Sequence, residues 1–123
     1  GLPIAMVAPS ATVGQARHAS EKSGHHRIIV GEQIEPGTTG FSDARVVGVV
    51  HVRDTLTSSE NMPIRRLIRP ILRLPAQQSI YESLAYMRRT SSHIAVVMDG
   101  GQVVGLVTLS DVLSGLVQRQ GSN

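Results

Sequence analysis

A hydroxyl and a carboxylate lie three residues apart at Thr108 and Asp111, directly after the apolar run at 103–107. At the start of a helix this spacing forms a capping box, in which the two side chains satisfy free backbone N–H groups. The same two groups can instead bind the hydroxyls of a ribose, while other N–H groups of the helix start face a phosphate. One Thr-x-x-Asp sequence by itself favours the capping role.

The same pattern occurs twice in the chain, as VVGVVHVRDTL at 46–56 and as VVGLVTLSDVL at 103–113. Asp54 corresponds to Asp111 at an offset of 57 (111 − 54). Upstream, RIIV resembles HIAV, and aligning Ile28 with Ile94 gives an offset of 66 (94 − 28). The first copy is therefore nine residues longer (66 − 57), within the Gly-, Thr- and Ser-rich stretch 31–44. That stretch predicts a long surface loop.

Each copy predicts the same order of elements, β-α-β-β-α. The helices would cover about 13–23 and 52–57 in the first copy and about 79–90 and 109–118 in the second. Ser10 or Thr12 could cap the first of them, and Ser79 with Glu82 has the spacing of a capping box. The Val- and Ile-rich runs between the helices are typical of strands covered on both faces.

These elements predict an α/β (α+β) fold of two pseudo-symmetric β-α-β-β-α motifs packed as one module. Motif 1 would cover residues 1–58, with its long loop at 31–44, and motif 2 would cover residues 71–120. The stretch 59–70 would link them. Two copies are too few for a solenoid and suit a pair that buries one shared core.

Composition excludes several classes of protein. The 123 residues contain no cysteine, so disulfides and thiolate-bound metals are absent. The net charge of +3 is mild. The aromatic residues Phe41, Tyr81 and Tyr86 are too few for a surface that stacks the bases of a nucleic acid. Arginines 65, 66, 69 and 73 favour a solvated linker over a phosphate-binding surface. Every apolar run is far shorter than the ~20 residues of a transmembrane helix, so we expect no direct membrane insertion by this chain.

Two suggestive combinations of side chains do not predict catalysis. His25 and His26 are adjacent, and neighbouring side chains of an extended segment point to opposite faces, which disfavours a shared metal ion. Ser92, His93 and Asp99 have the residue types of a hydrolase triad, but the sequence has no Gly-x-Ser-x-Gly elbow and no evident oxyanion hole. We therefore expect neither a metal site nor an enzyme.

The doubled apolar run with Gly and Asp, which ends in Thr-x-x-Asp in the second copy, resembles a pair of CBS domains. This adenosine-nucleotide-sensing unit is also called a Bateman module, and the resemblance covers essentially the whole chain. SGHHRIIV, VVGVVHVRDTL, IRPILRLP and SSHIAVVMDGGQVVGLVTLSDVL are similar to the CBS pair of the cyclin-M and CorC group, the hemolysin-C-like magnesium and cobalt transporters. Ile29 in place of Pro, Ser110 in place of Glu and the short turn at Asp99 depart from that group's pattern.

The resemblance implies two ligand sites, each formed by both motifs. Site one would combine Thr108 and Asp111 of the second motif with four residues of the first, Val7, His25, His26 and Arg27. Asp111 would bind the ribose, and Thr108 the ribose or a phosphate. Arg27 would contact phosphate, and backbone groups near the two histidines would bind the adenine edge.

Site two would be the weaker of the two. Its members would be His51, Asp54, Leu72, Ser92 and His93. His51 stands where Thr would provide a hydroxyl, and His93 stands where Arg would provide a fixed charge. Lowering the pH to about 6 would charge both histidines and reduce the difference.

The resemblance further implies a regulatory role. The ligand would be an adenosine nucleotide, ATP or AMP, with or without Mg²⁺. The module would form a homodimer and would be covalently attached to a transporter domain, on the cytoplasmic side of a membrane. Because the chain begins without Met, we expect a fragment of a longer protein. The alternative is an interaction module that dimerises its parent protein and binds no nucleotide.

Overall fold

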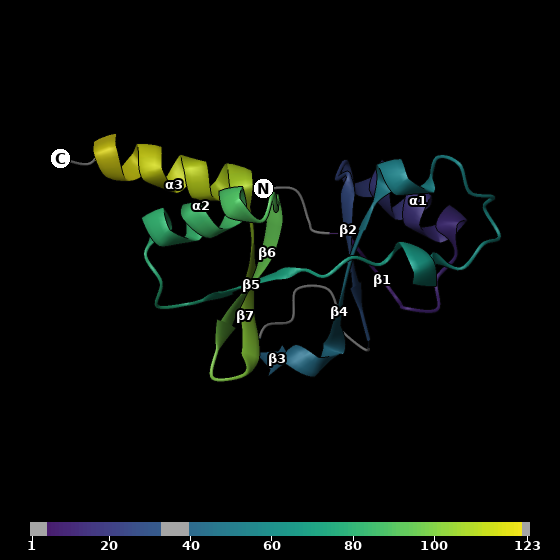
Figure 1. Ribbon diagram of the computed structural model, residues 1–123, viewed down its shortest axis with the longest axis horizontal. Coiled ribbons are helices and arrows are strands. Elements are labelled where there is room, and N and C mark those ends of the chain that lie inside the picture. The colour runs from purple at the N-terminus through teal and green to yellow at the C-terminus, as the bar shows by residue number, and fades with distance from the viewer. Residues whose placement is uncertain (1–4, 33–39, 122–123) are drawn as a thin grey trace. The chain divides into compact units, whose positions relative to one another are not determined.

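The computed structural model describes residues 5–32 and 40–121, with side-chain surroundings as far as residue 115. The chain divides into two compact units, each with its own sheet and core (Figure 1). Unit 1 comprises Gly1–Thr38 and Ala44–Pro70, and unit 2 comprises Thr39–Asp43 and Ile71–Asn123. Within the described residues, no helix combines the length and the apolar character needed to span a membrane.

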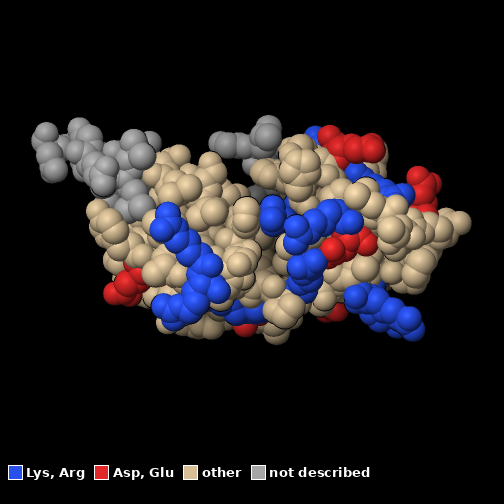
Figure 2. Space-filling view, turned by 45° about the horizontal axis from the view of Figure 1, so that its top comes forward, with Lys and Arg blue, Asp and Glu red and all other residues tan. Residues whose placement is uncertain are grey.

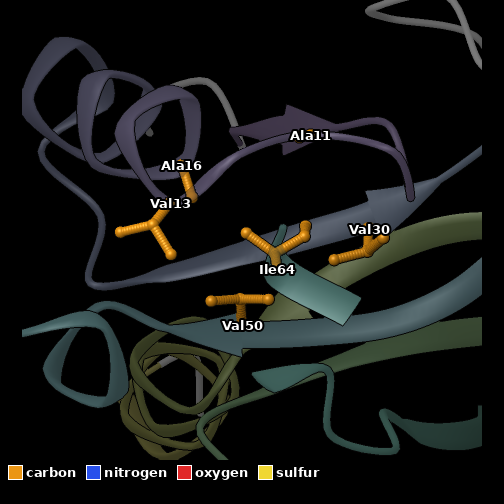
Figure 3. Close-up of a cluster of buried hydrophobic side chains, with 6 residues drawn as sticks. All are labelled: Ala11, Val13, Ala16, Val30, Val50 and Ile64. Atoms are coloured by element: carbon orange, nitrogen blue, oxygen red, sulfur yellow. The ribbon is translucent and has the colours of Figure 1, made fainter. Parts of the chain in front are cut away.

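Unit 1 contains a three-stranded sheet with the order β1-β2-β4. β1 (Met6–Val7) pairs in parallel with β2 (Arg27–Gly31), which pairs antiparallel with β4 (Val46–His51). Helix α1 (Val13–Ser23) packs on this sheet. Their contact buries a cluster of small and branched apolar side chains, drawn in Figure 3: Ala11, Val13, Ala16, Val30, Val50 and Ile64.

Helix α1 has the bounds that the sequence predicted, and Thr12 is its N-cap. The Thr12 hydroxyl accepts a hydrogen bond from the Gln15 N–H at 3.2 Å, and the Gln15 side chain accepts one from the Thr12 N–H at 2.9 Å. Gly24 ends the helix at a φ of 78°, a left-handed conformation that glycine adopts without steric cost. These signals are local, which is why the sequence alone located them.

Unit 2 contains a four-stranded sheet with the order β3-β7-β6-β5. β5 (Leu72–Pro75) runs parallel to β6 (Ile94–Asp99), and β7 (Gln102–Thr108) runs antiparallel to β6. Helices α2 (Ile80–Arg89) and α3 (Leu109–Gly121) pack together. The Ser79 hydroxyl caps α2 by accepting from the Glu82 N–H at 3.1 Å. The core of the unit is Leu74, Met87, Ala95 and Val112.

The short strand β3 (Phe41–Ser42) lies inside the stretch 31–44 that the sequence assigned to a surface loop. It pairs antiparallel with β7, Phe41 opposite Val103, and therefore belongs to unit 2. A 3-10 turn, η1 (Asp43–Arg45), follows it. The rest of the predicted loop, 33–39, lies outside the described residues.

The two units repeat one hydrogen-bonding plan, as the pseudo-symmetry of the sequence predicted. In both sheets the strand after the first helix pairs in parallel on one side and antiparallel on the other. In both, the N–H just after the last strand donates to a histidine carbonyl at 2.9 Å, from Val52 to His26 and from Leu109 to His93. The mixed α/β fold of two related motifs is therefore confirmed.

The strand pairing corrects the alignment of the two copies by one residue. Arg27 faces His51 across the ladder of unit 1, whereas Ile94 faces Thr108 across that of unit 2. The counterpart of Arg27 is therefore Ile94, at an offset of 67 (94 − 27), and not His93. The alignment by apolar letters was wrong because strands of similar composition match almost equally well when shifted by one residue, which exchanges their faces.

The helix predicted at 52–57 is only a 3-10 turn, η2 (Val52–Thr55). His51, at its N-terminal boundary, provides no side-chain cap. At the other end, the Arg17 guanidinium donates to the carbonyl of Thr55 and, at 3.1 Å, to that of Ser58. These carbonyls are thus held by a side chain of α1 instead of a further helical turn. In contrast, α3 continues past the predicted end at 118, to Gly121.

Candidate functional site

The Thr108–Asp111 junction between β7 and α3 is a reciprocal capping box. The Thr108 N–H donates to Oδ2 of Asp111, and the Asp111 N–H donates to Oγ1 of Thr108, both at 3.1 Å. Asp111 is exposed, and its other oxygen, Oδ1, accepts no hydrogen bond from any residue that the structure describes. Capping therefore leaves one carboxylate oxygen and the Thr108 hydroxyl proton available to a ligand, so the two roles of the motif are compatible.

The corresponding junction of unit 1 binds its carboxylate differently. Asp54 accepts two hydrogen bonds from Arg69, from Nε to Oδ2 and from Nη2 to Oδ1, both at 2.8 Å. His51 gives no capping hydrogen bond at this junction. Both oxygens of Asp54 are thus already engaged within unit 1.

Arg69 reaches Asp54 because its backbone is bound to the edge of β4. The Val49 N–H donates to the Arg69 carbonyl at 2.9 Å, and the Arg69 N–H donates to the Val49 carbonyl at 2.8 Å. The sequence pattern predicted a solvated linker at Arg69, which is wrong at this position because its guanidinium is bound to Asp54. Gly48 was the available signal, because a glycine inside a strand often marks the close approach of another backbone.

Beside this ion pair, β2 and β4 present two buried nitrogens that lack hydrogen-bond partners, Nε of Arg27 and Nδ1 of His51. Both residues line an open pocket of ≈ 460 Å³ whose other members are His26, Val52, Arg53 and Leu56. Burial, followed by the positive charges of Arg53 and Arg69, lowers the pKa of Arg27. A pocket with this excess of positive charge and unpaired donors suits an anion such as phosphate.

His51 is a neutral imidazole at pH 7. Burial is the largest cause that lowers its pKa below 6.5, and Arg69 and Arg27 lower it further, against the opposing effect of Asp54. Because its pKa is lowered, His51 gains less charge at about pH 6 than a free imidazole would. As a neutral imidazole it can donate or accept a hydrogen bond there, and its lowered pKa opposes a positive charge for a phosphate.

The backbone at His25 and His26 is largely engaged already. The His25 N–H donates to Oγ of Ser23 at 3.2 Å, and its carbonyl accepts from Oγ of Ser20 at 2.6 Å. The His26 carbonyl accepts from Val52. Few backbone groups of this segment therefore remain for an adenine edge.

The other candidate residues lie in strands or at their ends. Val7 on β1 and Leu72 on β5 are half-buried against the cores of their own units. Ser92 shares a hydrogen bond of 2.8 Å with the Thr90 hydroxyl, and His93 is exposed just before β6. Ser92 and His93 thus stand at the same end of the unit 2 sheet as Thr108, which pairs with Ile94.

Each unit carries one part of each expected site. Unit 1 contributes Val7, His25, His26 and Arg27 of site one and His51 and Asp54 of site two. Unit 2 contributes Thr108 and Asp111 of site one and Leu72, Ser92 and His93 of site two. In unit 1 the parts of both sites are neighbours, since Arg27 pairs with His51.

The charged surface offers no continuous basic face in the view of Figure 2. Lys and Arg side chains form separate groups there, and acidic side chains lie among some of them. Residues 5–32 and 40–121 also contain no cluster of three His, Cys, Asp or Glu side chains arranged to hold a metal ion.

Comparison with known proteins identifies this architecture. The CBS domain family matches residues 64–118, the second copy of the repeat. The fold matches the CBS domain of a bacterial CNNM/CorC family Mg²⁺ transporter, solved in complex with ATP, with a TM-score of 0.75 at 23% identity. That match covers 94% of this chain and 79% of the other, and so includes the first copy. The chain therefore has the fold of a pair of CBS domains.

The curated relatives of this chain are longer proteins. It is 32% identical to an uncharacterised protein of Mycobacterium tuberculosis over 126 residues, which are 98% of this chain and 34% of that protein. It is 38% identical to hemolysin C of Rickettsia prowazekii over 78 residues, 60% of this chain and 26% of that protein. The CBS pair thus resembles CNNM/CorC and hemolysin C proteins, as the sequence predicted. It spans about a third or less of the two curated relatives.

Proposed function

We propose that this CBS pair is the regulatory nucleotide-binding part of a membrane transporter of the CorC and cyclin-M type. It binds ATP, ADP or AMP, on the cytoplasmic side of the membrane, and it catalyses no reaction. The observation that carries this proposal is the junction of Thr108 and Asp111, where one carboxylate oxygen and one hydroxyl proton remain available after capping. The structural relative solved with ATP supports the same ligand class.

The proposed roles follow from the chemistry of each group. Oδ1 of Asp111 accepts hydrogen bonds from ribose hydroxyls, and the Thr108 hydroxyl donates to a ribose or phosphate oxygen. Arg27 binds phosphate, because its buried Nε lacks a partner in unit 1 and a guanidinium binds phosphate oxygens in a fork. Mg²⁺ accompanies ATP through the phosphates, since the described residues offer no metal-binding cluster of their own.

Isothermal titration calorimetry with ATP, ADP and AMP, with and without Mg²⁺, tests the proposal. We expect micromolar to millimolar dissociation constants, about −4 to −8 kcal/mol. Asp111→Asn should weaken binding about tenfold or more, because a hydrogen bond to a charged group contributes about 1.5–3 kcal/mol. The asparagine can still accept the Thr108 N–H, so circular dichroism should show an intact helix.

Asp99→Asn is the matched control. It removes the same charge from an exposed position at the end of β6, and it should leave binding unchanged. Absence of both heat and thermal shift with all three nucleotides at millimolar concentration would contradict the proposal.

A role as an interaction module is the second candidate. Both junction carboxylates already have partners within their own units, Asp111 with the Thr108 N–H and Asp54 with Arg69. In that case sedimentation velocity would show a dimer at tens of micromolar and no effect of nucleotide. The nucleotide-binding proposal also includes a homodimer. If sedimentation shows only the 13.2 kDa monomer, the dimer expected for both candidates is contradicted.

A further inference from the structure

The ion pair between Asp54 and Arg69 occupies the groups that a ribose would need. Arg69 donates to both carboxylate oxygens at 2.8 Å, and Nη2 also lies 2.7 Å from Oδ2. A ribose diol binds a carboxylate by donating to these same oxygens, so the guanidinium and the ribose compete for the lone pairs of Asp54. The Asp54 side chain is 24% exposed and that of Arg69 is 43% exposed, so solvent and ligand can reach the pair.

The backbone holds Arg69 in position for this contact. Two hydrogen bonds join its N–H and carbonyl to Val49, and Gly48 allows the approach. A Cβ atom at position 48 would lie 2.3 Å from the Arg69 carbonyl oxygen and 2.7 Å from Cγ2 of Ile68. The guanidinium is therefore pre-positioned, and little backbone freedom is lost when it binds Asp54.

The charged groups around the carboxylate differ between the two junctions. Arg53 and Arg69 both lie near enough to Arg27 for their positive charges to lower its pKa. Asp54 is the partner to which Arg69 donates both of its side-chain hydrogen bonds. At the equivalent junction of unit 2, the Asp111 carboxylate accepts only a backbone N–H and keeps one oxygen available.

We propose that Arg69 is an internal competitor for Asp54 and determines the low nucleotide affinity of the unit 1 junction. Nucleotide binds through Asp54 only in the fraction of molecules in which Arg69 has left the carboxylate. This inference rests on the proposed function, because it assumes that a free junction carboxylate binds ribose. The apparent dissociation constant then equals the intrinsic value divided by that fraction.

The experiment compares AMP binding in a chain that already carries Asp111→Asn, so that the unit 1 junction is observed alone. Arg69→Met keeps the aliphatic stem and removes the guanidinium. Bidentate but solvent-exposed pairs are weak, so we expect AMP to bind about three- to tenfold more tightly by calorimetry. Arg69→Lys retains a charge with point-like geometry and should give a smaller gain.

Arg66→Met is the matched control, because it removes the same charge from an exposed residue of the 3-10 turn η3 (Ile64–Leu67). It should change the dissociation constant by less than about twofold. Adding Asp54→Asn to Arg69→Met should abolish the gain. Circular dichroism and thermal melting verify folding of every variant, and the Lys variant serves if the Met variant unfolds.

The outcomes separate this inference from the proposed function. Equal AMP affinity in the Arg69→Met and Arg66→Met chains, or a gain that survives Asp54→Asn, overturns the role of Arg69 even if the native chain binds nucleotide through Asp111. A gain that depends on Asp54 supports it even if Asp111→Asn has no effect in the native chain. No binding in any variant overturns both.

Discussion

The junction after β7 and the junction after β4 begin from nearly the same sequence and reach different structures. Thr108 caps a helix of 13 residues, and Asp111 completes the cap. His51 provides no cap, a turn of four residues follows it, and Asp54 binds Arg69 instead. The carboxylate serves the helix start where Thr lies three positions before it, and it binds a distant side chain where His lies there.

The strands beside these junctions also differ in charge. Arg27 faces His51 in unit 1, and the buried Ile94 faces Thr108 in unit 2. Unit 1 therefore carries the cationic groups and unit 2 carries the uncompensated carboxylate. The two sheets share one hydrogen-bonding plan, whereas the side chains at their junctions differ.

The largest difference in stability should come from substitutions at the corresponding glycines Gly48 and Gly105. In Gly48→Ala the new Cβ meets the Arg69 carbonyl at 2.3 Å, so we expect a loss of about 1–3 kcal/mol in the free energy of unfolding. In Gly105→Ala the nearest atom is Cβ of Val97 at 3.9 Å, an ordinary contact, and the change should stay within about 0.5 kcal/mol. Chemical denaturation measures both, and equal losses would contradict the close approach of the two backbones at Gly48.

The second largest loss of stability should come from removal of the α3 cap in unit 2. Thr108→Ala deletes the hydroxyl that accepts the Asp111 N–H, so we expect a cost of about 1 kcal/mol and lower helicity. Thr108→Ser keeps the acceptor and should restore most of the stability. Thermal melting followed by circular dichroism makes the comparison, and a serine variant no better than alanine would assign the effect to the lost methyl group.

A smaller effect should come from the ion pair of unit 1. A double-mutant cycle of Asp54→Asn and Arg69→Met should give a coupling of about 0.5–1 kcal/mol, because both groups are partly exposed. The coupling should fall in 1 M salt, where the screening length is only about 3 Å. The pair Asp54→Asn and Arg66→Met should be additive, and a coupling of similar size there would mean that the effect is not specific to Arg69.

The smallest effect should be the pH dependence due to His51. Because its pKa is lowered from 6.5 in the folded state, the unfolded chain binds more protons between the two pKa values. The contribution of His51 to stability is therefore complete above pH 6.5 and is lost as the pH falls through the lowered folded-state value. His51→Gln should flatten the melting temperature over this range. An NMR titration of the ring with its midpoint at or above 6.5 would contradict the assignment.

Local signals explain most of what the sequence predicted correctly. The N-caps at Thr12, one of two candidates, and at Ser79 each depend on residues within a few positions of one another. The two junctions were recognised for the same reason. The choice of Thr108, Asp111 and Asp54 as candidate ligands rested on their spacing, on the repeat and on the resemblance to CBS pairs.

What the sequence did not predict depends on distant partners. The pairing of Arg69 with Asp54 spans 15 residues, and Gly48 was the one indication of it in the sequence. The shift of one residue in the alignment of Arg27 depends on cross-strand register, which apolar letters alone do not define. The lowered pKa of His51 arises from burial and from charges on other segments.

Strand β3 has a consequence for how the chain is made. Phe41 leaves the ribosome 62 residues before its partner Val103 (103 − 41), which takes about 3–12 s at the usual rates of translation. During this interval a phenylalanine that the native state buries stays without its strand partner. A gene fragment that begins at residue 71 would encode the second motif without this strand. Its β7 would then expose an open hydrogen-bonding edge, which promotes association between nascent chains.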